Sequence, residues 1–202
     1  MSQKYARTQI DLLRHGQLAT PGLFCAHPDE PLSKKGLEDL STATNNGRWD
    51  VIVSSPFQRC SEFAESLVKQ NQCALQLDDH FKEMDFGDWT GVKTDTLWQQ
   101  ESKHLQKLWQ SPDSFIAPEG ESMQAFISRV EQGVKNLLDN YKNNSVLLIT
   151  HAGVIRVILA SALEITHQSA LRFSIGHASL SRIHYYPDGV CSLYSHGLRR
   201  IE

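Results

Sequence analysis

Short apolar runs alternate with longer amphipathic segments along most of the chain. Four short runs, bounded by polar or turn-forming residues, favour β-strands: 8–13, 50–54, 74–77 and 145–149. Four other segments carry apolar residues at helical spacing: 33–43, 55–68, 122–140 and 154–163. The first and last strands are nearly all apolar, as strands buried on both faces are. The alternation predicts the α/β class, as a three-layer α/β/α sandwich with a mostly parallel central sheet.

Local signals indicate where several of these elements begin and end. Ser33 is a predicted N-cap of the first helix. Ser55 followed by Pro56 predicts an N-cap and the first residue of the second helix. Near the end of the chain, residues 179–186 and 190–195 are expected to pair as a hairpin across a Pro-Asp-Gly turn.

One long segment, 84–121, does not fit the alternation. Its pattern is helical but irregular over 94–110, and proline-containing stretches at 111–113 and 118–120 interrupt the rest of the segment. We interpret it as a helical lid insertion over the sheet edge. The length of 202 residues suits one domain, so we expect a single domain over residues 1–202.

Composition excludes several classes of function. A hydrophobic fraction of 40% and a charged fraction of 21% are typical of a globular protein. The net charge of -3 gives no general attraction to nucleic acid or an anionic membrane, so an anion site requires a local basic cluster. The N-terminus lacks a signal-peptide pattern, and the four cysteines are irregularly spaced. We therefore predict a cytoplasmic protein with no nucleic-acid or membrane partner.

Basic and imidazole side chains come directly after three of the predicted strands. Because ligands bind beyond the carboxyl ends of strands in open α/β sheets, we expect these side chains to meet at one crevice. A helix that begins near Ala152 adds backbone N–H donors for an anion, that of Gly153 among them. The clusters are Arg14-His15-Gly16, Ser54-Ser55-Pro56 with Arg59, and Thr150-His151-Ala152-Gly153.

A phosphate dianion is the ligand that suits such a crevice best. The guanidinium groups of Arg14 and Arg59 match phosphate oxygens and stay charged. An imidazole attacks phosphorus only when neutral, and neighbouring arginines should lower its pKa from the usual value of about 6.5. We therefore predict that an imidazole of this crevice, from His15 or His151, acts as a nucleophile; the alternative for His15 is a histidine that only packs in the core.

Four segments, in chain order, resemble the motifs of the histidine phosphatase superfamily, which is also called phosphoglycerate mutase-like. The Arg-His-Gly triplet alone is a weak signal, but four ordered motifs across most of residues 10–155 are specific. The resemblance implies a phosphoglycerate mutase-like fold and the chemistry of a phosphoric monoester hydrolase. The segments are Leu13-Arg14-His15-Gly16-Gln17, Ser54-Ser55-Pro56-Phe57-Gln58-Arg59-Cys60, Pro118-Glu119-Gly120-Glu121-Ser122 and Thr150-His151-Ala152-Gly153-Val154.

The resemblance also implies a role for each matching residue. His15 would be transiently phosphorylated, while Arg14 and Arg59 would hold the phosphoryl oxygens. His151 would donate to the phosphoryl group and stabilise its developing charge. No metal or other cofactor is expected, because the arginines supply the positive charge.

The proton donor and one phosphate contact are less well defined by the motifs. Glu83 matches the residue that protonates the leaving oxygen and then activates water, with Asp85 and Asp88 as neighbouring alternatives. Many relatives place an asparagine or similar polar residue seven positions after the first arginine, where this chain has Pro21. The predicted phosphate shell is therefore one contact short.

The insertion favours a phosphatase over a mutase, because it holds three lysines and no arginine for a second anionic group. Residues 54–60 and 83–91 look closest to the α-ribazole phosphatase group of cobalamin nucleotide-loop assembly. The alternatives are a broad-specificity sugar or small-metabolite phosphatase, a phosphoglycerate mutase and a non-enzymatic binder of a phosphorylated partner. We expect a small phosphorylated metabolite as the ligand and a monomer or homodimer as the assembly.

Overall fold

A six-stranded sheet forms the middle layer of the computed structural model, which describes residues 6–201. Residues 1–5, on which the expected lack of a signal peptide partly rests, and residue 202 lie outside the described residues. The strand order is β3-β2-β4-β1-β5-β6. The strands are β1 (Thr8–Arg14), β2 (Val51–Ser54), β3 (Ala74–Leu77), β4 (Ser145–Thr150), β5 (Leu180–Tyr185) and β6 (Cys191–Leu198).

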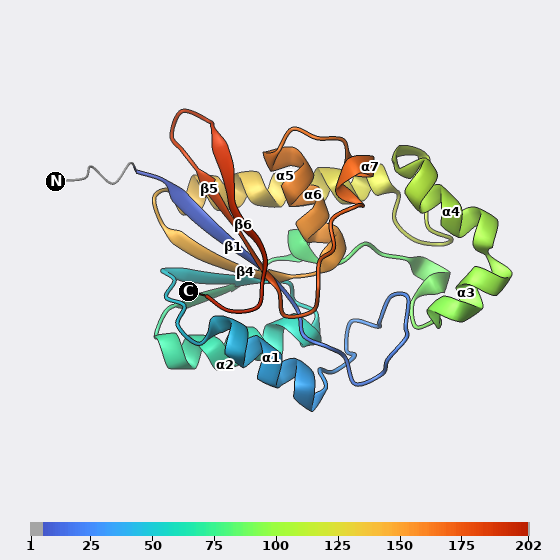
Figure 1. Cartoon of the computed structure of the whole chain (residues 1–202), viewed down its shortest axis with the longest axis horizontal. Coiled ribbons are helices and arrows are strands. Elements are labelled where there is room, and N and C mark those ends of the chain that lie inside the picture. Colours follow the sequence, from blue (N-terminus) through green and yellow to red (C-terminus); the bar gives the residue numbers. More distant parts are fainter. Residues whose placement is uncertain (1–5, 202) are drawn as a thin grey trace.

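Helices cover both faces of this sheet, so the predicted three-layer fold is confirmed (Figure 1). Helices α1 and α2 lie on one face, and α5 and α6 lie on the other. The helices are α1 (Lys34–Thr44), α2 (Gln58–Asn71), α3 (Thr94–Gln100), α4 (Ser102–Gln110), α5 (Met123–Asn140), α6 (Ala152–Ala162) and α7 (His167–Ala170), with 3₁₀ helices at Asp79–Phe81, Gly87–Trp89 and Pro112–Ser114.

Strand direction determines which chain segments reach the functional edge of the sheet. Strands β3, β2, β4 and β1 are mutually parallel, so their carboxyl ends lie at the same edge. The predicted hairpin β5–β6 is antiparallel, and Leu180 at the start of β5 pairs with Leu13 near the end of β1. The residues just before β5 are therefore brought to the same edge.

Alternating side chains of the central strands fill two apolar layers. In β4, Val146 and Leu148 pack in the cluster beneath α5 and α6, whereas Leu147 and Ile149 pack in the cluster beneath α1 and α2. This period of two is that of a strand buried on both faces. Each fully buried aliphatic side chain of this size contributes about 1.5–3 kcal/mol to folding. The burial of these side chains anchors the strand ends that carry polar residues.

The predicted helix starts differ in outcome. Ser33 caps α1, and its side chain accepts a hydrogen bond from the Gly36 N–H at 3.0 Å, as predicted. The prediction that Ser55 caps α2 is wrong, because the N-cap is Phe57 and the helix begins at Gln58. The Ser55 hydroxyl is instead within hydrogen-bond distance of His151.

The insertion 84–121 forms a short helical arm that is shown in green in Figure 1. The irregular pattern over 94–110 corresponds to two helices, α3 and α4, which meet at Glu101. The arm is tied down by the Phe24 N–H, which donates to the Val92 carbonyl at 2.9 Å, and by the Gln168 amide, which donates to the Gln110 carbonyl at 3.0 Å. Its movement as a lid remains a prediction.

No helix within residues 6–201 has the length and apolarity needed to cross a membrane.

Candidate active site

The side chains predicted to carry the chemistry meet beyond the ends of β1, β2 and β4. The rings of His15 and His151 lie 5.3 Å apart between centroids. Arg14, His15, Arg59 and Glu83 line one cavity of about 260 Å³, which we call the phosphoryl pocket. His151 is fully buried directly behind it. The predicted convergence of the three strand ends is therefore present in the structure.

His15 is held with one ring nitrogen free. Its Nδ1 lies 2.8 Å from the Gly16 carbonyl oxygen, and a carbonyl only accepts, so Nδ1 carries the proton and Nε2 carries the lone pair. Burial, followed by Arg14 and Arg59, lowers the pKa of His15 well below its usual value. The ring is therefore neutral near pH 7, which is the form that attacks phosphorus.

The loop after β1 depends on close contact with α1. A Cβ added at Gly16 would lie 2.4 Å from the Gly36 carbonyl oxygen, so a larger residue would push the two segments apart. The Ser33 hydroxyl also donates to the carbonyl of Gln17 at 3.1 Å. The start of α1 therefore fixes the loop that carries His15.

Arg14 presents one donor that has no partner among the described residues. Its Nη1 donates to the Ile175 carbonyl at 2.6 Å, and its Nη2 donates to His177 Nε2 at 2.9 Å. Its Nε is buried and unpaired. Burial lowers the pKa of Arg14 to about 10, which leaves the guanidinium charged at neutral pH. An unpaired cationic donor in this pocket is suited to an anionic oxygen.

Arg59 is nearly inaccessible to solvent, with 2% exposure. Its Nη1 donates to the His27 carbonyl at 2.8 Å, and its guanidinium lies 4.9 Å from the centre of the Phe57 ring. Its Nε donates to His151 Nδ1 at 3.3 Å. These contacts hold the guanidinium of Arg59, a residue that lines the phosphoryl pocket, away from bulk solvent.

His151 is positioned by Ser55, whose role the helix-capping prediction missed. His151 Nε2 lies 2.8 Å from the Ser55 hydroxyl, and Nδ1 accepts from Arg59. Burial, followed by Arg59 and His15, lowers the pKa of His151 well below its usual value. Donation from Nδ1 to a phosphoryl group requires the other tautomer, which the hydroxyl also supports because it can donate as well as accept.

Glu83 lies at the N-terminus of α6. Its Oε2 accepts from the Gly153 N–H at 3.1 Å, and its Oε1 accepts from the Met84 N–H at 3.2 Å. A Cβ added at Gly153 would lie 2.3 Å from Oε1, so only glycine permits this approach. The Gly153 N–H, which we expected to face phosphate, thus donates to the carboxyl group. The alternatives Asp85 and Asp88 do not line the phosphoryl pocket, nor do they line a second cavity that adjoins it and is described below.

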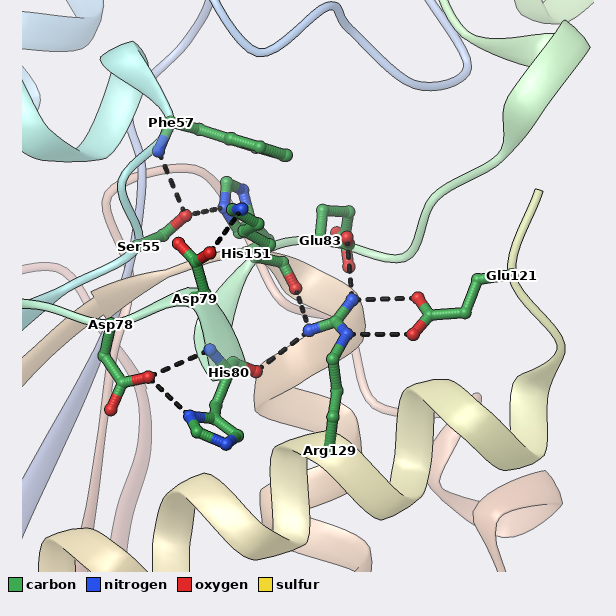
Figure 2. A network of polar contacts seen from close by, with 10 residues as sticks. Ser55, Phe57, Asp78, Asp79, His80, Glu83, Glu121, Arg129 and His151 are labelled. Carbon is green, nitrogen blue, oxygen red and sulfur yellow. Dashed lines mark hydrogen bonds and ion pairs between the residues drawn. The ribbon is translucent and has the colours of Figure 1, made fainter.

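The backbone that carries Glu83 is fixed by Arg129 of α5, as Figure 2 shows. Arg129 Nε and Nη2 form a two-point ion pair with Glu121 at 2.8 and 2.9 Å. Nη1 donates to the carbonyls of His80 and Lys82, both at 2.9 Å, and Nη2 donates to the carbonyl of Glu83 at 3.1 Å. Glu121 stands in the third motif, so the sequence contained a signal for this pair.

A second cavity, of about 300 Å³, adjoins the phosphoryl pocket, and we call it the apolar pocket. The two share Arg14, Phe24, Glu83 and Phe86. Arg156 of α6 also lines the apolar pocket and donates to the Phe173 carbonyl from Nε at 3.2 Å. The apolar side chains of its wall include those of Met84, Leu108, Trp109, Met123, Phe126 and Val157.

The tryptophans of the insertion occupy three different environments. Trp109 lines the apolar pocket, and Trp98 stacks on it from outside with ring centroids 5.8 Å apart. Trp89 is buried in the core. Trp109 is thus placed to contact a ligand in the apolar pocket, whereas Trp89 packs in the core.

No group of three or more His, Cys, Asp or Glu side chains within residues 6–201 is arranged to hold a metal ion. Cys25, Cys60, Cys73 and Cys191 are all free thiols.

Comparison with known proteins gives matches along most of the chain. The family model of the histidine phosphatase superfamily (branch 1) matches residues 10–195. A bifunctional protein of Mycobacterium tuberculosis is 29% identical over 192 residues, which are 92% of this chain and 52% of that protein. The chain thus spans about half the length of this relative. The adenosylcobalamin/alpha-ribazole phosphatase of Escherichia coli is 26% identical over 177 residues, 85% of this chain and 87% of that protein.

Among solved structures, the alpha-ribazole phosphatase from Shigella flexneri superposes with a TM-score of 0.82. It is 25% identical, and the match covers 96% of this chain and 98% of that one.

Proposed function

Because this chain belongs to the histidine phosphatase superfamily (branch 1), we propose that it hydrolyses phosphate monoesters through a phosphohistidine on His15. One observation carries the proposal. His15, whose neutral imidazole has its lone pair on Nε2, lines the same pocket as Arg14, whose buried Nε has no partner among the described residues. A nucleophile without a proton and a cationic donor without a partner together suit a phosphoryl group.

In the first step, Nε2 of His15 bonds to phosphorus while the bond from phosphorus to the ester oxygen breaks. The ring becomes cationic, and the Gly16 carbonyl stabilises it by accepting from Nδ1. Arg14 and Arg59 stabilise the charge on the phosphoryl oxygens, with His151 as a further donor. The departing oxygen takes a proton from Glu83, which begins the step protonated and ends it as a carboxylate.

In the second step, water attacks the phosphorus of phosphohistidine. The phosphorus–nitrogen bond breaks, and Glu83 accepts a proton from the water. Inorganic phosphate forms, and both side chains return to their starting states. Glu83 suits both steps because it lines both the phosphoryl pocket and the apolar pocket. The ester oxygen would lie where these two pockets meet.

For the substrate, we propose α-ribazole 5'-phosphate, within cobalamin nucleotide-loop assembly in the cytoplasm. The apolar pocket beside the phosphoryl pocket has aromatic and aliphatic walls, which suit a flat benzimidazole. The name of the Escherichia coli relative, at 26% identity, agrees with this choice.

A second candidate, a mutase acting on phosphorylated carboxylic acids, is favoured by one observation. Arg156 places a cation in the apolar pocket, where a second anionic group could bind. The lysines of the insertion, Lys93, Lys103 and Lys107, do not line that pocket. Beyond Arg14, which both pockets share, Arg156 alone is a poor match for a second phosphate group, which supports the phosphatase proposal.

Acid-quench labelling tests the reaction. Wild-type protein mixed with a radioactively labelled phosphate ester should yield an acid-labile phosphohistidine, and His15→Ala should yield none. Full turnover by His15→Ala would overturn the proposal.

A panel of esters tests the substrate. α-Ribazole 5'-phosphate should give a higher kcat/KM than sugar phosphates. The assay should include 3-phosphoglycerate with bisphosphoglycerate, because efficient isomerisation there would favour the mutase.

A further inference from the structure

A third histidine, His177, lies beside the nucleophile, although it belongs to none of the four motifs. The antiparallel entry into β5 places it there. The Arg14 N–H donates to the Ser179 carbonyl at 3.1 Å, and the Ala178 N–H donates to the His15 carbonyl at 3.2 Å. His177 therefore lies at the carboxyl edge of the sheet, in the lining of the phosphoryl pocket.

The contacts of His177 define which nitrogen carries its proton. Its Nε2 lies 2.9 Å from Arg14 Nη2, and a guanidinium only donates, so Nε2 accepts. The neutral ring must then carry its proton on Nδ1. Burial, followed by Arg14 and Arg199, lowers the pKa of His177 to about 4, so the ring is neutral near pH 7. Nδ1 has no hydrogen-bond partner among residues 6–201.

On the loop after β1, the lining of the same pocket includes the polar residues Gln17 and Thr20 and the apolar Pro21. Pro21 has no backbone N–H to donate. The rings of His177 and His15 are 5.4 Å apart between centroids, so a phosphoryl group bonded to His15 would be adjacent to both.

We propose that His177 is a further phosphoryl-binding residue, which orients Arg14 through Nε2 and donates from Nδ1 to a phosphoryl oxygen. The proposal rests on the phosphatase function above, since it assigns one more contact in the same pocket. It gives this chain a donor on the β5 side of the pocket, in place of one on the Pro21 side. The charged and titratable groups that face His177 are Arg14, Arg199 and His15.

Calorimetric titration with inorganic phosphate, at pH 7.5, tests this assignment without depending on a leaving group. His177→Phe keeps an aromatic ring, somewhat larger than imidazole, that can neither accept nor donate, and we expect it to weaken phosphate binding at least tenfold, about 1.4 kcal/mol. His177→Asn can accept from Arg14 and donate to phosphate, and should recover most of the affinity. His196→Gln is the matched control, because His196 bonds to Ser181 outside the pocket; it should bind as wild type does.

Nitrogen-15 NMR of the imidazoles separates direct contact from a purely structural role. Added phosphate should shift the Nδ1 resonance of His177, while Nε2 keeps the signature of an unprotonated acceptor. Unchanged phosphate affinity in a folded His177→Phe, or an Nδ1 resonance that does not respond to saturating phosphate, would overturn the role of His177. Wild-type protein that neither binds phosphate nor forms phosphohistidine would overturn the phosphatase function as well.

Discussion

The phosphoryl pocket and the apolar pocket are neighbours, but they are built from different kinds of structure. The phosphoryl pocket lies at strand ends, and its arginines are oriented by backbone carbonyls and imidazoles. The apolar pocket lies between α6, α7, the start of α5 and the insertion, and apolar side chains form most of its wall. The contrast indicates that reaction chemistry and choice of leaving group reside in separable parts of the molecule.

Glu83 belongs to both pockets. A change in the phosphoryl pocket should slow all esters alike, whereas a change in the apolar pocket should slow some esters and spare others. The effect of a change at Glu83 on the rate should depend on the chemistry of the leaving oxygen rather than on the shape of the leaving group. Substitutions and pH changes can test each side of this comparison.

Replacement of the carboxyl group at the boundary should have the largest effect. Glu83→Gln removes the proposed proton donor, and we expect kcat/KM to fall by about 10²–10⁴ for alkyl phosphates. The loss should be much smaller for p-nitrophenyl phosphate, whose leaving oxygen needs no proton. Steady-state kinetics with both esters measures this, with Asp85→Asn as the matched carboxyl control. Equal losses for the two esters would contradict the assigned role.

Displacement of the same carboxyl group should have the next largest effect. Gly153→Ala places a Cβ 2.3 Å from Glu83 Oε1, so the side chain must move from the helix N-terminus. We expect kcat to fall by about 10–100-fold, with little change in phosphate affinity. Kinetics and phosphate titration of one preparation, with its melting temperature as the control for folding, provide the check. Wild-type kcat would show that this position of Glu83 is not required.

The pH dependence of stability should report on the phosphoryl pocket, through the buried rings of His15 and, behind it, His151. Burial lowers the pKa values of His15 and His151, so below pH 6.5 the unfolded chain binds protons that the folded chain does not. Their contribution is present above pH 6.5 and lost as pH falls, at up to about 1.4 kcal/mol per pH unit for each ring. Urea unfolding at several pH values between 7.5 and 5.5 gives the free energy of unfolding at each pH. This free energy should depend less steeply on pH in His151→Gln than in the wild type. An unchanged slope would contradict the assigned direction.

A truncation in the wall of the apolar pocket should have the smallest and most selective effect. Trp109→Ala removes an aromatic side chain that lines the apolar pocket but not the phosphoryl pocket, and that stacks on Trp98 with ring centroids 5.8 Å apart. We expect KM to rise by about 3–10-fold for esters with large apolar leaving groups. Small esters such as glycerol phosphate should be nearly unaffected. Comparison of KM across the ester panel measures the difference, and a uniform rise would argue against separable pockets.

The difference between strand ends and loops explains which residues of the site could be predicted from the sequence. His15, Arg14, Arg59 and His151 lie in motifs directly after strands or at the start of a helix, so the sheet topology alone brings them together. Glu83 lies on a loop, and its position depends on the carbonyl contacts of Arg129, which no local pattern reveals.

Other parts of the site required the three-dimensional structure. Ser55 was assigned to a helix cap because serine before proline is a common helix start, but its hydroxyl bonds to a histidine distant in sequence. His177 reaches the pocket only because β5 runs antiparallel to β1, and a predicted hairpin does not specify that direction. Arg156 comes just after a recognised motif on an apolar helix, and its pocket exists only once the insertion folds over it.

Arg129 has a consequence for how freely the chain can vary. Within residues 80–83 its guanidinium bonds to main-chain carbonyl oxygens, so it recognises the course of the backbone rather than the identity of the side chains. The side chain at 82 is therefore expected to tolerate substitution, whereas the ring of His80 is held by Asp78 at 2.7 Å, and the carbonyls at both positions must keep their directions. This makes position 82 a suitable place for a spectroscopic label or a solubility change close to Glu83.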